Sequence, residues 1–185
     1  MKARVAVVLA ITMLFCLSML PAKADQWTYE LGRSPGQFHL IGVIVISEAG
    51  AAYTDIPLKA GEGWRNVQAK DLQTDEPLRF EIQPGTNGAG PVLRVYFKNP
   101  VPEQGVVKIQ IEADVLCSSV RLEGGRIVFD RATGGDITVI LPAGCAVVHC
   151  SVPVTIYEKG DGRTVLKRTT DHYTQTLIKA RPFEP

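Results

Sequence analysis

The sequence lacks an excess of charge of either sign and is poor in aromatic residues. Its 185 residues include 20 Lys and Arg against 19 Asp and Glu, and only 7% are aromatic. Nucleic acids and anionic membrane surfaces are bound through clusters of basic side chains, and no basic stripe is present here. The composition therefore argues against both kinds of partner.

The motifs of common catalytic and cofactor chemistries are also missing. The sequence contains no Gly-Lys-Ser/Thr phosphate loop and no Gly-x-Gly-x-x-Gly fingerprint. A nucleophile needs a base beside it, but His39, His149 and His172 have no catalytic signature around them. Pairs such as Cys150–His172 or Cys117–His149 can be drawn, yet a structural or surface role fits each histidine better. We therefore predict that the chain is not an enzyme and needs no cofactor.

Acidic residues are plentiful, but they form no recognised motif. Glycoside hydrolysis needs two carboxylates that flank the scissile bond, and most carboxylates here fall on expected strand faces or turns. No Asp-x-Asp-x-Asp-Gly calcium loop occurs. One region does gather carboxylates that could coordinate calcium, and we interpret them as solvated: Asp55, Glu62, Asp71, Asp75 and Glu76.

The first 24 residues have the order of a secretory signal peptide. Lys2 and Arg4 precede an apolar run from Val5 to Leu20, which is followed by the small-x-small triplet Ala22–Ala24. The run is shorter than the roughly 18 or more residues expected of a spanning helix. We predict cleavage after Ala24, with no transmembrane segment left in the mature chain. Retention as an uncleaved N-terminal anchor is the alternative.

The leader predicts export, to the periplasm or the extracellular space. Residues 25–185 are enough for one domain with a sizeable core, and no linker or repeat divides them. We therefore expect a single domain over 25–185.

The cysteines of the mature chain suggest one disulfide. With Cys16 in the leader, Cys117, Cys145 and Cys150 remain, and an oxidising compartment favours a bridge. If Cys145 to Cys150 is extended, their Cα atoms lie roughly 16 Å apart, beyond the about 7 Å limit of a disulfide. We expect Cys117 to bridge one of the two. The alternative is that all three are small buried apolar residues. A zinc site from Cys145, His149 and Cys150 is disfavoured, because its spacing matches no standard pattern.

Alternation of apolar and polar residues dominates the rest of the chain. In the clearest case, Val107, Ile109, Ile111 and Ala113 share one face of a predicted half-buried strand. Further strands with this alternation are expected at 79–83 and 93–98. The segment His39–Ile46 is apolar on both faces after its first residue, which predicts a central strand that is covered on both sides.

Turn signals separate these strands at short intervals. Gly124-Gly125, between Val120–Leu122 and Arg126–Phe129, has the form of a tight hairpin loop. Further strands are expected at 137–141, 152–157, 164–169 and 173–180. The segment 64–72 comes nearest to helical periodicity but fits a strand equally well. Short strands with frequent turns predict an all-β fold, an antiparallel β-sandwich of immunoglobulin-like or related type.

A series of short strand and turn segments also resembles a known architecture. The segments are Asp55–Leu58, Asn66–Ala69, Leu93–Phe97, Pro100–Pro102, Leu141–Gly144 and Asp161–Arg163. In this order they resemble the non-catalytic, all-β N-terminal module of M1-type aminopeptidases. The His-Glu-x-x-His zinc motif of that family is absent here, so no peptidase residue carries over. The resemblance implies architecture only.

The sequence contains two tryptophans, Trp27 and Trp64. Exposed aromatic rings on a β-sandwich can stack on sugar rings, so both are candidate ligand-stacking residues. The competing interpretation is that both pack into the core. The all-β pattern, the leader and the missing catalytic set together favour a non-catalytic envelope protein. Its expected role is to bind another envelope protein through a sheet face or exposed edge. The alternative is a glycan-binding module that recognises a polysaccharide through Trp27 or Trp64.

Overall fold

The structure is a computed structural model that describes residues 25–32, 34–85 and 90–182. This part of the chain forms strands and contains no helix, and so none that could span a membrane. The predicted leader and its expected cleavage site after Ala24 lie outside the described residues. The strands are β1 (Gln26–Leu31), β2 (Gln37–Ile46), β3 (Tyr53–Pro57), β4 (Gly63–Asp71), β5 (Phe80–Gln83), β6 (Val92–Tyr96), β7 (Val107–Leu116), β8 (Val120–Glu123), β9 (Arg126–Ile140), β10 (Cys145–Cys150), β11 (Thr155–Glu158) and β12 (Thr164–Pro182).

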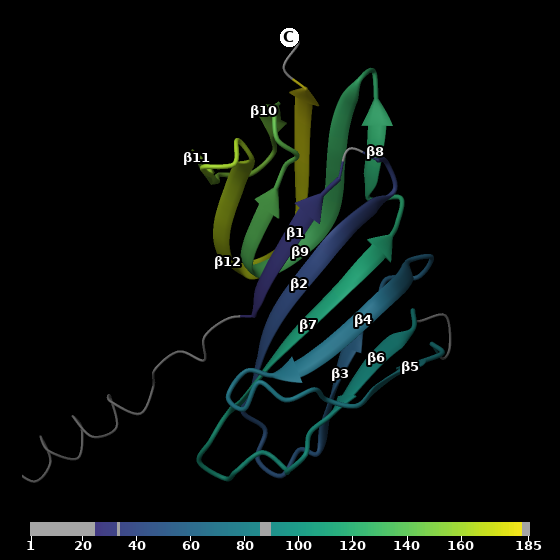
Figure 1. Cartoon of the computed structure of the whole chain (residues 1–185), viewed down its shortest axis with the longest axis vertical. Coiled ribbons are helices and arrows are strands. Elements are labelled where there is room, and N and C mark those ends of the chain that lie inside the picture. Colours follow the sequence, from purple (N-terminus) through teal and green to yellow (C-terminus); the bar gives the residue numbers. More distant parts are fainter. Residues whose placement is uncertain (1–24, 33, 86–89, 183–185) are drawn as a thin grey trace, which may run out of the picture.

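The strands form one large sheet and one small sheet. The large sheet has the order β10-β12-β9-β1-β2-β7-β4, with β8 paired to β9 and β11 paired to β12. The small sheet has the order β3-β6-β5. In Figure 1 the small sheet lies at the lower end of the molecule, and β8, β10 and β11 lie at the upper end. The predicted all-β sandwich is thereby confirmed.

One strand pair departs from the antiparallel arrangement that the sequence predicted. β1 pairs antiparallel with β2 but parallel with β9, for example with Trp27 opposite Gly42 and Ile137. β1 and β2 are close neighbours in the sequence, which favours the antiparallel pairing that they form. β9 joins the other side of β1 only after the chain has built β2 to β8. Its direction is set by β8 and β12, and both pair with it antiparallel.

Inward-facing side chains of the two sheets, with a few from connecting segments, form two cores, as alternation predicts. The upper core consists of Tyr29, Leu31, Phe38, Leu40, Ala113, Val115, Cys117, Val120, Ile127, Phe129, Ile137, Val139, Leu141, Cys145, Leu166, Ile178 and Ala180. The lower core lies between the large and small sheets and consists of Ile44, Ile46, Ile56, Leu58, Ala69, Leu78, Leu93, Val95, Val101, Val107, Ile109 and Ile111. β2 and β7 contribute to both cores with the same face.

The predicted position of β2 is correct, but its predicted burial is not. β2 is central, between β1 and β7. Its inward residues are buried, whereas Ile41, Val43 and Val45 on the outer face are only half-buried. The apolar run was therefore misread as a strand covered on both sides, because β-branched residues also suit a sheet face that is partly open to water.

Two long strands replace pairs of shorter ones that the sequence predicted. β9 and β12 pair along most of their length, with a register shift between Thr170 and Thr174 of β12. Opposite this irregularity, Gly135 of β9 has a φ of +77°, a conformation that favours glycine. The bulge lets both strands change direction without ending. The predicted Gly124-Gly125 hairpin between β8 and β9 is confirmed.

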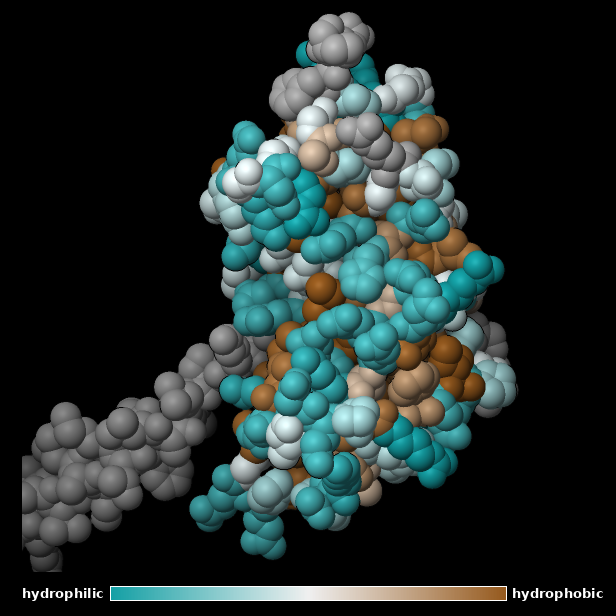
Figure 2. All heavy atoms as spheres, viewed as in Figure 1, coloured by the Kyte–Doolittle hydropathy of each residue, from teal (hydrophilic) through white to brown (hydrophobic). Residues whose placement is uncertain are grey.

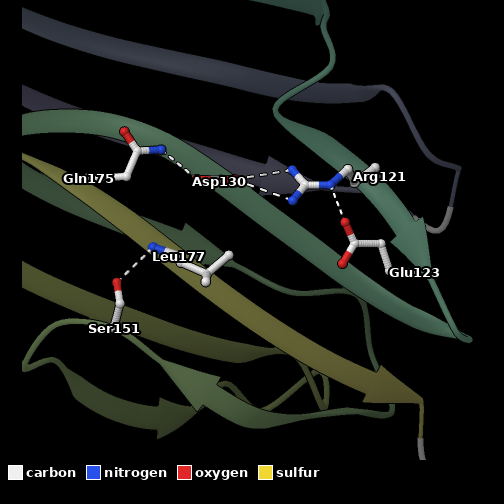
Figure 3. Close-up of polar contacts among 6 residues, drawn as sticks. All are labelled: Arg121, Glu123, Asp130, Ser151, Gln175 and Leu177. Carbon is white, nitrogen blue, oxygen red and sulfur yellow. Dashed lines mark hydrogen bonds and ion pairs between the residues drawn. The ribbon is translucent and has the colours of Figure 1, made fainter.

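Polar contacts join the strands at the upper end of the molecule. Figure 3 shows Asp130 of β9 between Arg121 of β8 and Gln175 of β12. Arg121 also pairs with Glu123 on its own strand, and the Ser151 hydroxyl accepts the Leu177 amide at 2.9 Å. On the face shown in Figure 2, hydrophilic and hydrophobic residues are interspersed. These polar contacts link β8, β9 and β12 beside the upper core.

Candidate functional site

A cavity of about 280 Å³ lies where the upper and lower cores meet on the inner side of the large sheet. We call it the tryptophan pocket. β1, β2, β3, β4 and β9 all contribute to its wall. The lining residues are Asp25, Trp27, Tyr29, Leu40, Ile44, Thr54, Asp55, Ile56, Pro57, Trp64, Arg131, Ala132, Thr133, Gly134 and Tyr173.

Trp27 reaches the pocket because its partner on the next strand is a glycine. Trp27 of β1 lies opposite Gly42 of β2. A Cβ atom added to Gly42 would lie 2.4 Å from Cζ3 of Trp27, closer than any real contact. The six-membered ring of Trp27 therefore lies directly against the β2 backbone, and it packs against both cores while remaining partly exposed.

Trp64 enters the same pocket from β4, an edge strand of the large sheet. It lies near the start of β4, opposite Val115 of β7, so its side chain is on the inward face. Its indole N–H donates to Oε2 of Glu62 at 3.4 Å. Trp64 is also half-buried and packs against both cores. The two tryptophans predicted separately from the sequence thus line one cavity.

A buried ion pair forms part of the pocket wall. Arg131 of β9 pairs with Glu62, which lies just before β4. Both guanidinium Nη atoms donate to the carboxylate, one of them to Oε2 at 3.3 Å. The Glu62 side chain is only 2% exposed and that of Arg131 14%. A pair this well buried holds its geometry, because leaving either charge alone in the interior would be costly.

Aromatic rings of the upper core surround the guanidinium of Arg131. Its Cζ atom lies 5.8 Å from the centre of the Tyr29 ring and 5.5 Å from that of Phe38. Burial disfavours the charged form, but Glu62 outweighs this, and the pKa of Arg131 lies above its ordinary value. Burial raises the pKa of Tyr29, because it disfavours the charged phenolate, and the nearby charge of Arg131 partly offsets this rise. Arg131 is therefore charged and Tyr29 neutral at physiological pH.

Asp25 places a second carboxylate at the pocket, ahead of β1. Burial raises its pKa, while a hydrogen bond from the Val45 amide at 3.4 Å partly offsets the rise. Its carbonyl oxygen accepts the Asp136 amide at 2.9 Å. No cation of the described residues lies within ion-pair distance of this carboxylate, in contrast to Glu62.

Tyr173 stands at the rim of the pocket on the bulge of β12. The bulge places residues 171–173 opposite Gly134 of β9. A Cβ atom on Gly134 would lie 2.9 Å from Cδ2 of Tyr173, so the ring packs over this glycine. Tyr173 is nevertheless 83% exposed. It offers an aromatic surface to a ligand that enters the pocket.

The pocket combines aromatic and polar residues. Four aromatic residues, one arginine, two aspartates and two threonines line a space of small-molecule size. Ligand sites commonly combine an apolar, aromatic lining with a few placed polar groups in this way. The lining includes neither histidine nor cysteine. A nucleophile with an adjacent base is not assembled in this cavity.

The disulfide predicted from the sequence is wrong, because the structure forms no bridge among Cys117, Cys145 and Cys150. Cys117 directly follows β7, and Cys145 is the first residue of β10. Four strands of the large sheet lie between β7 and β10. Cys117 and Cys145 are both buried in the upper core. The thiol of Cys150 donates to the Val152 carbonyl at 3.2 Å. The alternative interpretation, small apolar residues packed in or against the core, fits the structure.

The histidines lie in separate places. His39 is on the outer face of the large sheet, where its Nδ1 is 2.9 Å from Oδ1 of Asp114. Hydrogen bonds from His39 and from Asn66 hold the pKa of Asp114 below its ordinary value. His149 is exposed on β10 and His172 is exposed on β12. The structure does not bring His149 to buried Cys117.

The acidic residues considered for calcium do not converge either. No group of three or more residues able to hold a metal occurs among the described residues. Each of the five carboxylates has a partner of its own: Asp55 with Arg94, Glu62 with Arg131, Asp75 with Lys70, Glu76 with Lys98, and Asp71 with the Gln73 and Thr74 amides.

Sequence reasoning missed four residues of the pocket: Asp25, Tyr29, Arg131 and Tyr173. Arg131 follows a predicted strand and carries no motif, and its partner Glu62 is far away in the sequence. The one available signal was the Gly134-Gly135 pair beside Arg131, since glycines inside a strand often mark a bulge or a close approach.

Comparisons with known proteins identify the architecture. No protein-family model matches the chain, and no curated protein matches its sequence. An M1 zinc metallopeptidase from Deinococcus radiodurans is similar in structure, with a TM-score of 0.55 and 13% sequence identity. The match covers 85% of this chain but only 41% of the peptidase. A candidate nutrient-binding protein from Legionella pneumophila matches with a TM-score of 0.54 and 8% identity, over 86% of this chain and 66% of that one.

These matches bear out the resemblance seen in the sequence. At such low identity they show the fold alone. The chain has an all-β sandwich architecture similar to that of the M1-type N-terminal module, and it spans less than half of the peptidase.

Proposed function

We propose that this chain is a non-catalytic exported protein of the cell envelope that binds a saccharide in the tryptophan pocket. The observation that carries the proposal is the convergence of Trp27 and Trp64, the two tryptophans of the sequence, on one cavity from different strands. The leader predicted at residues 1–24 supports the periplasm or the cell exterior as the place of action.

The chemistry of the lining suits a sugar. Aromatic rings offer flat apolar faces to the C–H groups of a pyranose, and the pocket holds Trp27, Trp64 and Tyr29 with Tyr173 at its rim. Sugar hydroxyls need both donors and acceptors, which Arg131 and Asp25 provide. The cavity is near the lower end of ligand pockets, about 300–1,000 Å³. We therefore expect it to hold one or two sugar units of a longer chain.

The protein is first screened for binding against a panel of cell-wall and storage oligosaccharides. The affinity for those that bind is then measured by isothermal titration calorimetry. Trp64→Ala and Trp27→Ala should each weaken binding at least tenfold. Tyr157→Ala is the matched control, because Tyr157 is an exposed aromatic residue on β11 that does not line the pocket; it should bind as the wild type does. Absence of binding across the panel, or unchanged binding by both tryptophan variants, would refute the proposal.

A second candidate function is binding of another envelope protein through a sheet face. The outer face of the small sheet carries stacked tyrosine and arginine side chains, with Arg94 4.1 Å from the Tyr53 ring and Arg79 4.6 Å from the Tyr96 ring. Tyr and Arg dominate the energetics of many interfaces. The variant Tyr53→Ala/Arg94→Ala should then lose a stoichiometric envelope partner and retain saccharide binding.

Strand addition at an edge is less favoured than this face. β4 and β10 both have register shifts, and β11 has only four residues. Bulges and short edge strands are the features with which proteins protect sheet edges from further pairing.

A further inference from the structure

We infer that Glu62 sets the charge selectivity of the tryptophan pocket, so that the pocket accepts uncharged saccharides and rejects those that carry a carboxylate. This inference rests on the proposed function of the pocket. It assigns a specificity-determining role to a residue that does not itself line the cavity.

The ion pair crosses the pocket wall. Arg131 lines the tryptophan pocket, whereas Glu62 is absent from its lining and borders a separate cavity with Gly61, Gly63 and Cys117. The Glu62 side chain is almost fully enclosed, with 2% exposure. A ligand in the pocket meets Arg131 and not Glu62.

This arrangement cancels the charge that a ligand would otherwise find. An arginine in an aromatic pocket is an effective carboxylate receptor, because its N–H groups can form paired hydrogen bonds to both oxygens. Here both Nη atoms already donate to Glu62. Tyr29 and Phe38 flank the guanidinium, so it has little freedom to turn toward a second carboxylate. Arg131 keeps N–H groups for sugar hydroxyls but offers no uncompensated positive charge.

The other charged groups at the pocket do not restore a positive charge. Asp55, at the rim, is held by two hydrogen bonds of 2.7 Å from Arg94, which is not part of the lining. Asp25 contributes a carboxylate. Removal of the predicted leader would add one α-ammonium group at Asp25, which balances this carboxylate and leaves no net cation. A carboxylated sugar would therefore be desolvated without an opposite charge, which is costly.

The experiment compares matched neutral and acidic ligands. The probes are β-linked trisaccharides of glucose, galactose and mannose and the corresponding uronic acid trisaccharides, which differ only at C6. Affinities are measured by calorimetry on the wild type and on Glu62→Gln, in which the amide keeps an acceptor for the Trp64 N–H. We expect the wild type to bind a neutral trisaccharide at least tenfold more tightly than its uronate. In Glu62→Gln this ratio should fall at least fivefold, because Arg131 gains an unpaired charge.

Two further variants isolate the effect. Glu123→Gln changes the net charge by the same amount in an exposed ion pair with Arg121 outside the pocket, and its ratio should stay within twofold of the wild type. Glu62→Gln/Arg131→Gln removes both charges and should keep the wild-type ratio. A shift of equal size in either variant would overturn the inference.

The outcomes separate this inference from the proposed function. If the wild type binds none of the six trisaccharides and no member of the wider panel, the proposed function fails. If the wild type binds neutral and acidic forms equally, or Glu62→Gln leaves the ratio unchanged, the charge selectivity fails while saccharide binding stands. Should Glu62→Gln fail to fold, Glu62→Asp replaces it: the shorter carboxylate cannot reach both Nη atoms of Arg131, so the ratio should again fall, and an unchanged ratio would overturn the inference.

Discussion

The two cores of this protein differ in chemistry although they share the same sheet. The lower core consists of aliphatic side chains alone. The upper core contains Tyr29, Phe38 and Phe129, with Tyr29 5.4 Å from the ring of Phe38 and 5.3 Å from that of Phe129. The tryptophan pocket lies at the junction, with its ionic and aromatic groups supplied mainly from the upper side. The lower side contributes the β3 segment Thr54–Pro57.

This difference suggests that the two ends of the inward faces of β2 and β7 have different roles. The lower core closes a simple sandwich between two sheets. In the upper core the large sheet bends at the bulge of β9 and β12, which brings Arg131 and Tyr173 to the pocket. The lower core can therefore be regarded as the support of the site and the upper core as its source of chemistry.

The largest expected effect comes from emptying either core. Phe129→Ala should lower the free energy of unfolding by about 3–5 kcal/mol, and Leu93→Ala by about 2–5 kcal/mol, since both side chains are fully buried. Because β2 and β7 run through both cores, each variant should unfold in a single transition in urea, followed by fluorescence and circular dichroism. Two separated transitions would show that the cores fold independently.

Breaking the buried ion pair should cost less than emptying the upper core and more than breaking an exposed pair. Arg131→Ala leaves Glu62 buried without a counter-charge, which costs roughly 3 kcal/mol. The matched exposed pair is Asp55–Arg94, with side chains 40% and 25% exposed, and Asp55→Ala should cost about 0.2–1 kcal/mol. Urea unfolding of both variants measures the difference. Equal losses would contradict the distinction between buried and exposed pairs.

A methyl group on the floor of the pocket should have a smaller effect. Gly42→Ala places a Cβ atom where the Trp27 ring lies, and overpacking of this kind costs about 1–3 kcal/mol. Because the displaced ring lines the pocket, the tryptophan emission maximum should also shift. Gly50→Ala is the control for the loss of a glycine, because a Cβ atom at position 50 meets nothing within 4 Å. The φ of Gly50, +77°, adds only backbone strain to this variant. An unchanged emission spectrum in Gly42→Ala would count against the packing described.

The smallest expected effect concerns pH. Burial raises the pKa of Asp25 above the ordinary 3.8, so the folded protein holds this proton more tightly than the unfolded chain does. The contribution of Asp25 to stability is therefore largest below pH 3.8 and is lost as the pH rises through the raised pKa. Asp25→Asn cannot ionise, so its stability relative to wild type should increase across that window and then stay constant. Unfolding free energies between pH 3 and 7 test this, and a relative stability that falls with pH would refute it.

The lower core could be predicted from the sequence almost strand by strand. β6 and β7 alternate cleanly between apolar and polar residues, and turn residues mark their ends. Such alternation fixes which face of a strand is buried, because a shift of one residue would turn every side chain over. It does not fix which strands are neighbours. The parallel pairing of β1 with β9 was missed for that reason.

The pocket was only partly predictable. Trp27 and Trp64 were recognised as candidates because large aromatics are informative wherever they occur. Their convergence depends on Gly42, whose importance appears only when β1 lies beside β2. Arg131 gave no sequence signal, since its role comes from Glu62 across the fold. The disulfide was mispredicted because sequence spacing excluded one bridge but could not show that four strands separate β7 from β10.

Nuclear magnetic resonance of the indole N–H groups tests the central claim most directly, because the sequence contains two tryptophans and so gives two such signals. Titration with the saccharide that binds most tightly should shift both indole signals with one saturation curve. The amide of Gly134, at the pocket wall, should shift with them, while that of Tyr157 on β11 should not. Saturable binding that leaves both indole signals in place would contradict the tryptophan pocket as the binding site.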